Sequence, residues 1–175
     1  MRAASWNRKL MREAARLFDP AEFTEANLRL PLYDGDLEAL GIPAEVQLLA
    51  DQIRDADAVV IAGPEYNKAM SGVLKNALDW ISRTKGGVWR DKPVAILSAA
   101  AGRAGGERSQ MTLRHAMTPF RAHVLPGPEV MIASPDREFD DAGRLTGDMP
   151  VKLLTELMGD LRDAAGRGDR HRAAG

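Results

Sequence analysis

Large apolar residues recur along this chain with two spacings, one typical of helices and one typical of buried strands. Where they return every three or four positions, they share one helical face, as Leu10, Ala14, Leu17 and Phe18 do. Short runs that are apolar without interruption are typical of parallel strands covered on both faces. The spacing predicts helices over residues 5–18, 43–55, 73–83, 106–118 and 149–165, and strands over residues 57–62 and 93–97.

The strand, helix and strand that follow one another across residues 57–97 predict a right-handed βαβ unit and hence a parallel sheet. Residues 1–165 are therefore expected to form a single α/β domain. Residues 166–175 contain no apolar residue larger than alanine, and we expect this tail to be mobile. The remaining segments are predicted to be short strands at 122–125 and 130–133, a weak element at 22–28, and polar connections at 30–41 and 134–148.

Composition removes several classes of function. The 175 residues carry a net charge of −1, which gives no electrostatic reason to bind nucleic acid or an anionic membrane. The absence of cysteine excludes disulfides and thiolate chemistry. The three histidines are scattered without the spacing of metal ligands, so no metal site is expected. Without a membrane-length apolar stretch or a signal-peptide pattern, a cytoplasmic location is the default expectation.

Three polar loops are expected to meet at the carboxyl edge of the sheet, where open α/β sheets bind ligands. The first contains Arg2, Ser5 and Asn7, at the start of the first helix. Guanidinium, hydroxyl and amide groups beside a helix N-terminus suit a phosphate, because the free N–H groups and the helix dipole already favour an anion. The alternative is a plain helix cap, with Ser5 as the N-cap residue and Arg2 in solvent.

The second loop, Pro64, Glu65, Tyr66 and Asn67, follows the Gly63 turn at the end of an apolar strand. An aromatic ring and an amide held by a rigid turn can contact a flat heterocycle. The alternative is an ordinary strand-to-helix connection with Tyr66 in the core.

The third loop follows the next strand and contains Ser98 and Gly102, with two more glycines at 105 and 106. Glycines before a helix allow a ligand to approach the backbone closely. The loop matches neither the dinucleotide-binding nor the Walker pattern, so a flexible connection is the alternative.

These motifs together resemble the NAD(P)H-dependent FMN reductase family, and most closely its bacterial quinone/chromate reductase branch. The resemblance is carried by GPEYN followed by SGVLKNALDWISR (residues 63–83), by PLYDGD (residues 31–36), and by the glycine turn that ends at Arg108. It implies a flavodoxin-like three-layer αβα sandwich with a parallel sheet that binds FMN without a covalent bond. By the same resemblance, Arg2, Ser5 and Asn7 hold the phosphate, Pro64, Glu65, Tyr66 and Asn67 lie along the isoalloxazine ring, and Ser98 and Gly102 lie on its other side.

The sequence departs from the family pattern in three places. Numbering begins at Met1, where the family has the leucine of its phosphate loop, so the first strand is expected to be missing. In the flavodoxin-like strand order 2-1-3-4-5 that strand is central. Ser71 stands where the family usually has proline, and Ala99 and Ala100 replace the usual hydroxyl residues.

The resemblance implies ping-pong transfer of two electrons, in which NADPH or NADH delivers hydride to flavin N5 and a quinone or similar acceptor then takes the electrons. It also implies a homodimer or homotetramer. No residue is assigned as an obligatory proton donor, because the chemistry belongs to the cofactor. The alternative is a non-catalytic flavodoxin-like protein that has lost FMN. A flavodoxin-type electron carrier ranks last, because such carriers are usually strongly acidic. The acceptor and the preference between NADPH and NADH stay open.

Overall fold

The computed structural model describes the backbone of residues 4–172 and the side chains of residues 4–166. Within this part of the chain, four parallel strands form one sheet. They are β1 (Val59–Ala62), β2 (Pro93–Ala100), β3 (His123–Val124) and β4 (Val130–Ala133). One edge of β2 pairs with β1, and the other edge pairs first with β3 and then with β4. β2 is therefore the central strand of the described sheet.

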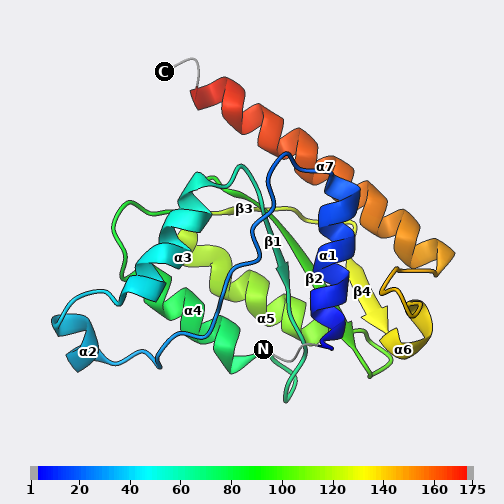
Figure 1. The fold of residues 1–175 in the computed structure, drawn as a ribbon, viewed down its shortest axis with the longest axis horizontal. Coiled ribbons are helices and arrows are strands. Elements are labelled where there is room, and N and C mark those ends of the chain that lie inside the picture. Colours follow the sequence, from blue (N-terminus) through cyan, green and yellow to red (C-terminus); the bar gives the residue numbers. More distant parts are fainter. Residues whose placement is uncertain (1–3, 173–175) are drawn as a thin grey trace.

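Helices cover both faces of this sheet and make three layers (Figure 1). On one face, α1 (Trp6–Phe18) and α7 (Asp148–Arg172) pack with the strands into one hydrophobic core. On the other, α3 (Ala44–Asp55), α4 (Gly72–Ser82) and α5 (Glu107–Met117) form a second core. Residues of β2 alternate between the two cores, with Leu97 in the first and Ile96 in the second. This two-sided burial explains the uninterrupted apolar run.

The predicted α/β fold with a parallel sheet is confirmed, and most helix bounds agree with the expected ranges to within one or two residues. Some segments differ. The loop expected over 30–41 contains the short helix α2 (Gly35–Ala39), and the connection over 134–148 contains α6 (Pro135–Glu138). A 3-10 turn, η1 (Thr118–Phe120), follows α5. Residues 22–28 form neither helix nor strand. None of the helices within residues 4–172 is long and apolar enough to cross a membrane.

The last helix continues to Arg172, well past residue 165, where the apolar spacing ends. The mobility of residues 166–175 and the single-domain assignment of residues 1–165 stay predictions, and residues 173–175 lie outside the described part.

The outer edge of β1 faces no strand within the described residues, since β1 pairs only with β2. Residues 4 and 5, which precede α1, form no strand either. The expected loss of the first strand concerns this edge of the sheet. It stays a prediction, because residues 1–3 are outside the described part.

The PLYDGD loop is fastened to α4 by three hydrogen bonds. The carbonyl of Pro31 accepts from Asn76 Nδ2 at 2.9 Å and from Trp80 Nε1 at 2.8 Å, and the Tyr33 N–H donates to Asn76 Oδ1 at 2.8 Å. Trp80 is fully buried by its own chain, so it is a core residue and not an exposed subunit contact. On the surface of α4, Asp79 pairs with Lys75, and Arg83 pairs with Glu38.

Candidate functional site

Three loops gather at the carboxyl edge of the sheet, at the lower end of the molecule in Figure 1. They are the start of α1, the loop between β1 and α4, and the loop between β2 and α5. Parallel strands bring their carboxyl ends to one edge, so segments far apart in sequence become neighbours there. The geometry therefore brings together the loops that the sequence singled out.

Asn7 joins the start of α1 to the end of β2. Its Nδ2 donates to the carbonyl of Ala99 at 2.8 Å, and the Ala99 N–H donates to its Oδ1 at 2.9 Å. The side chain is buried, and both ends of the amide are used. Asn7 therefore places the first turn of α1 beside the sheet edge, and its amide is not directed at a phosphate.

Ser5 is the N-cap residue of α1, with an extended backbone. This is the position that the helix-cap alternative gave it, but among the described residues its hydroxyl caps no N–H group of the first turn. The first N–H groups of a helix lack partners within the helix. The hydroxyl and these N–H groups are thus available to an anion. Arg2, the third member of this predicted set, lies outside the described residues.

The loop after β1 folds into a tight turn at Tyr66–Ala69. Tyr66 and Ala69 exchange two backbone hydrogen bonds of 3.0 Å, while Asn67 and Lys68 between them have positive φ angles of 51° and 65°. Positive φ at both central residues is typical of a type I′ turn, which asparagine tolerates well. The side chain of Tyr66 is 63% exposed, so the alternative that placed it in the core is wrong.

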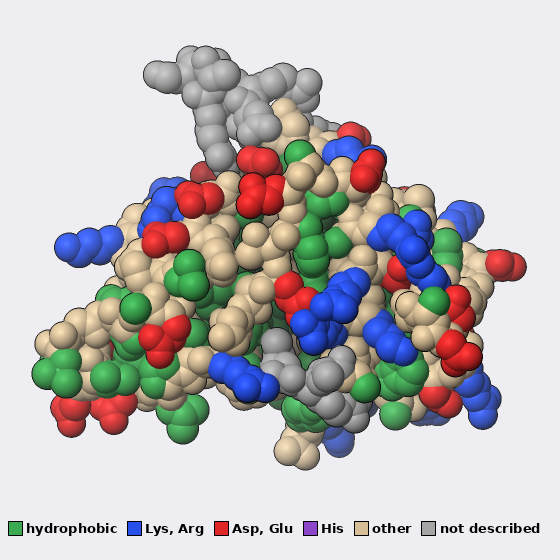
Figure 2. Space-filling model, in the orientation of Figure 1, with side chains coloured by type: hydrophobic (Ala, Val, Ile, Leu, Met, Phe, Trp, Pro, Cys, Tyr) green, Lys and Arg blue, Asp and Glu red, His purple; other side chains and the backbone are tan. Residues whose placement is uncertain are grey.

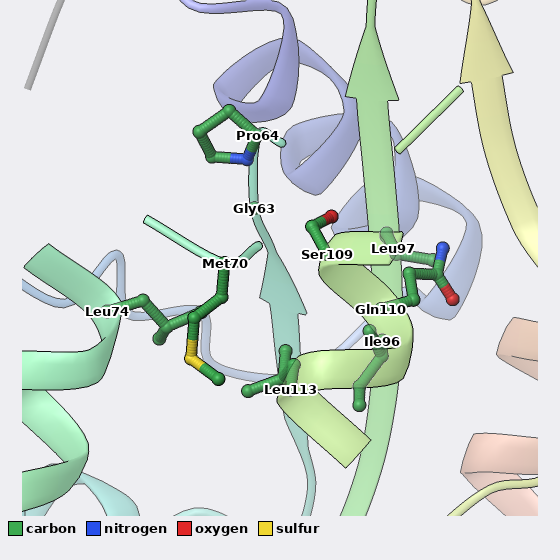
Figure 3. Close-up of a pocket in the computed structure, with 9 residues that line it drawn as sticks. All are labelled: Gly63, Pro64, Met70, Leu74, Ile96, Leu97, Ser109, Gln110 and Leu113. Atoms are coloured by element: carbon green, nitrogen blue, oxygen red, sulfur yellow. The ribbon is translucent and has the colours of Figure 1, made fainter. Parts of the chain in front are cut away.

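Glu65 and Pro64 lie deeper in this loop than Tyr66. The carboxylate of Glu65 accepts a hydrogen bond of 3.1 Å from the backbone N–H of Arg108, in the first turn of α5. Pro64 lines a cavity of about 10 Å³ between the loop and α5, together with Ser109 and Gln110 (Figure 3). That volume suits at most one water molecule. This cavity therefore has no room for a flat ligand beneath the loop.

The hydroxyl of Ser98 hydrogen-bonds the backbone of the third loop from the protein interior. Ser98 is fully buried; its Oγ donates to the carbonyl of Gly105 at 2.7 Å and accepts from Gln110 Nε2 at 2.9 Å. Gln110 Nε2 also donates to the carbonyl of Val130 at 2.9 Å, which ties the loop to β4. Direct contact with a ligand, as the resemblance implied for Ser98, is thus not open to this side chain. Gly102, in contrast, is exposed.

The sequence predicted a site role for Gly102, but glycine is required by the backbone path at Gly105 and Gly106. Gly105 has φ +57°, and a Cβ there would lie 2.6 Å from the carbonyl carbon of Met131. Gly102 has ordinary φ and open space at its Cβ position within the described residues. The Gly-Gly pair was the available signal, because adjacent glycines indicate positive φ or a close approach.

A separate cluster of three hydrogen-bonded side chains joins α2 to the end of α4. Tyr33 Oη donates to Glu38 at 2.7 Å, and Arg83 Nε donates to the same carboxylate at 2.9 Å. The hydrogen bond from Tyr33, followed by that from Arg83, holds the pKa of Glu38 below its ordinary value. This cluster links α2 to α4 and lies outside the three loops.

Comparison with known proteins decides the family. The profile described as NADPH-dependent FMN reductase matches residues 1–136. An NAD(P)H-dependent FMN reductase of Pseudomonas aeruginosa is 43% identical over 164 residues, which cover 93% of this chain and 89% of that protein. This chain belongs to the NADPH-dependent FMN reductase family. It is accordingly an oxidoreductase whose cofactor is FMN and whose co-substrate is NAD(P)H.

Two further known proteins are also similar to this chain. A quinone reductase of Escherichia coli K12 is 47% identical over 103 residues, which cover 58% of this chain and 55% of that protein. The solved structure of FerB, a flavoenzyme NAD(P)H:(acceptor) oxidoreductase from Paracoccus denitrificans, superposes with a TM-score of 0.86 at 30% identity, covering 95% and 93% of the two chains. The similarity of the two folds agrees with the flavodoxin-like architecture implied by the sequence.

The described residues fit an FMN reductase site. At the start of α1, the Ser5 side chain caps no N–H group within the described residues, and a hydroxyl beside first-turn N–H groups suits a phosphate. The turn at Tyr66–Ala69 follows β1, and the exposed Gly102 follows β2. A Cβ at Gly102 would meet no atom of the described residues within 4 Å. Backbone N–H groups and an exposed aromatic side chain suit the polar edge and the flat face of a flavin.

Proposed function

We propose that this FMN reductase passes two electrons from NAD(P)H to a quinone or a similar small acceptor. The observation that carries the proposal is the similarity to a named NAD(P)H-dependent FMN reductase over 93% of this chain. Quinone reductases of bacteria and plants among its relatives favour the acceptor class. The alternative of a chain that has lost FMN is not favoured by these relatives.

In this proposal, the start of α1 binds the phosphate. Ser5 contributes its hydroxyl, and Arg2, outside the described residues, would contribute charge. Asn7 acts indirectly, because its amide is held by Ala99 and fixes where the helix begins. The dipole of α1, a helix of 13 residues, adds to the attraction of the anion.

The other two loops hold the isoalloxazine ring of FMN. Pro64, Tyr66 and Asn67 form one side, and the backbone around Gly102 forms the other, supported from below by Ser98. Bound FMN would supply two-electron transfer between the nicotinamide and the acceptor. The protein residues bind, orient and limit access; none of them is required as a proton donor. The location is proposed to be cytoplasmic, where NAD(P)H is available.

A homo-oligomer is also proposed, and its support is an exposed apolar surface. Leu32, just before α2, is 81% exposed, and Leu40, the C-cap residue of α2, is 87% exposed. Hydrophobic side chains gather at the lower left of Figure 2, the end where Figure 1 shows α2. Leu32 also lines an open hollow of about 250 Å³ with Val73 of α4. Sedimentation of the L32D/L40D double variant should give a smaller species than wild type if this surface joins two copies.

The proposed function is tested by the absorption spectrum of the purified 175-residue chain with FMN, before and after NADPH or NADH is added anaerobically. The expected result is FMN that copurifies or binds stoichiometrically, bleaches with the reductant, and regains its colour when a benzoquinone is added. A protein that binds no FMN would overturn the proposal. Comparing the bleaching rates with NADPH and NADH determines the co-substrate preference.

A further inference from the structure

The loop that carries Tyr66 is docked onto α5 at two points, one on each side of its turn. Before the turn, Glu65 accepts from the Arg108 N–H at 3.1 Å. After it, the Met70 N–H donates to Thr112 Oγ1 at 2.9 Å. Pro64 and Met70 both line the small cavity shown in Figure 3, together with Ser109 and Leu113 of α5. The tip of the loop projects beyond these two points and is exposed.

The side chain of Glu65 caps the N-terminus of α5. The N-cap residue is Gly106, which has no side chain to cap the helix, and Arg108 is the second residue of its first turn. The Glu65 carboxylate, 17% exposed, takes the place that a local cap would fill, from 43 residues away in sequence. A carboxylate is favoured there because the helix N-terminus carries partial positive charge. The Arg108 guanidinium, 4.0 Å away, adds a weaker attraction.

A turn with two positive φ residues needs such support. Asn67 tolerates this conformation, but Lys68 has no side-chain feature that favours it. The two bonds between Tyr66 and Ala69 close the turn, while the docking on α5 sets its orientation relative to the sheet. Without the Glu65 contact, the turn should keep its two internal hydrogen bonds but lose its fixed orientation relative to the sheet.

We propose that Glu65 is a positioning residue: it holds the Tyr66 turn in place through the first turn of α5 and thereby sets the affinity for FMN. This inference rests on the proposed function and refines the resemblance, which placed Glu65 along the flavin. The carboxylate acts through the backbone of Arg108 and does not touch the cofactor. What matters is an acceptor atom at this position, more than its charge.

The test compares Glu65→Ala with Glu65→Gln in the full chain. Glutamine keeps an oxygen that can accept from the Arg108 N–H, whereas alanine removes it. The matched control is Glu107→Ala, which removes an exposed carboxylate from the same helix turn. Two quantities are measured: amide hydrogen exchange of the FMN-free protein at Tyr66, Ala69, Met70 and Arg108, and the dissociation constant for FMN by fluorescence titration.

For Glu65→Ala we expect faster exchange at these amides and FMN binding weakened by about tenfold or more, the size of a lost hydrogen bond to a charged group. Glu65→Gln should restore both quantities to within about threefold, and Glu107→Ala should leave them near wild type. Glu65→Ala with unchanged exchange and affinity would overturn the inference. So would Glu65→Gln binding FMN as weakly as Glu65→Ala, because a charge or a direct contact would then be required. Wild type that binds no FMN would defeat the proposed function, and exchange alone would then decide whether Glu65 holds the turn.

Discussion

Gly106 lies directly against Ser98 at the end of the central strand: a Cβ on Gly106 would stand 2.7 Å from the Ser98 Cβ and 2.8 Å from its Oγ. Gly106 also has φ +98°, a conformation that side chains rarely adopt. The loop over β2 therefore depends on two adjacent glycines for its path. The third glycine, Gly102, has neither constraint within the described residues.

This contrast predicts opposite outcomes for two similar substitutions. Gly106→Ala should lower the free energy of unfolding by about 2 kcal/mol or more, because it adds backbone strain and overpacks Ser98. Gly102→Ala should change it by less than about 0.5 kcal/mol. Urea denaturation of both variants measures the difference. Equal stability of the two variants would show that the loop can move away from Ser98 at little cost.

Asn7 is predicted to stabilise the fold through the backbone of Ala99. Asn7→Ala leaves the N–H and the carbonyl of Ala99 unpaired in a buried place, and should lower the free energy of unfolding by about 2–3 kcal/mol. The control is Asn27→Ala, since Asn27 accepts from the Arg29 N–H at an exposed site. We expect the control to cost less than about 0.5 kcal/mol. Similar unfolding curves for both variants would contradict this role of Asn7.

Trp80 and Trp89 offer a second matched pair. Both are buried, but Trp80 Nε1 donates to the Pro31 carbonyl at 2.8 Å, whereas Trp89 Nε1 has no hydrogen-bond partner among the described residues. Trp80→Phe loses a hydrogen bond, while Trp89→Phe removes an unsatisfied donor. Thermal unfolding should therefore show Trp80→Phe to be less stable than Trp89→Phe by about 1–2 kcal/mol. The reverse order would exclude the Pro31 contact as a stabilising anchor.

Glu25 should make the free energy of unfolding fall as the pH is lowered. Partial burial raises the pKa of this carboxyl, but hydrogen bonds and charge from Arg8 and Arg12 outweigh it, so the pKa lies below the ordinary 4.5. A depressed pKa means that the contribution to stability is present above pH 4.5 and is lost as the pH falls through the lower folded-state pKa.

We expect Glu25→Gln to be less stable than wild type at neutral pH and to approach it as the pH falls below 4.5. Unfolding curves from pH 7 to pH 3 measure this convergence. Glu22→Gln, at an exposed position on the same segment, is the control and should run parallel to wild type. A stability difference for Glu25→Gln that stays constant with pH would mean that its charge is not involved. High salt should reduce the neutral-pH difference, since the pair is partly exposed.

The amino-acid sequence determined the layered fold and predicted that three polar loops meet at one edge of the sheet. Burial on both faces made β1 and β2 recognisable as uninterrupted apolar runs. Burial of one face gave the helices their apolar spacing of three or four residues, in α1, α3, α4, α5 and α7. The order of these elements then required a parallel sheet. Motif resemblance indicated the family and FMN, and both are supported by the comparisons.

Only the tertiary structure decided what each site residue does. Asn7 and Ser98 have the side chains expected of ligand contacts, yet both hydrogen-bond the backbone of other segments and are buried. Glu65 caps a helix that begins 42 residues later, at Glu107. Such partners are distant in sequence, and local patterns carry no information about them. The path of the chain determines which polar groups face each other and which remain free for a ligand.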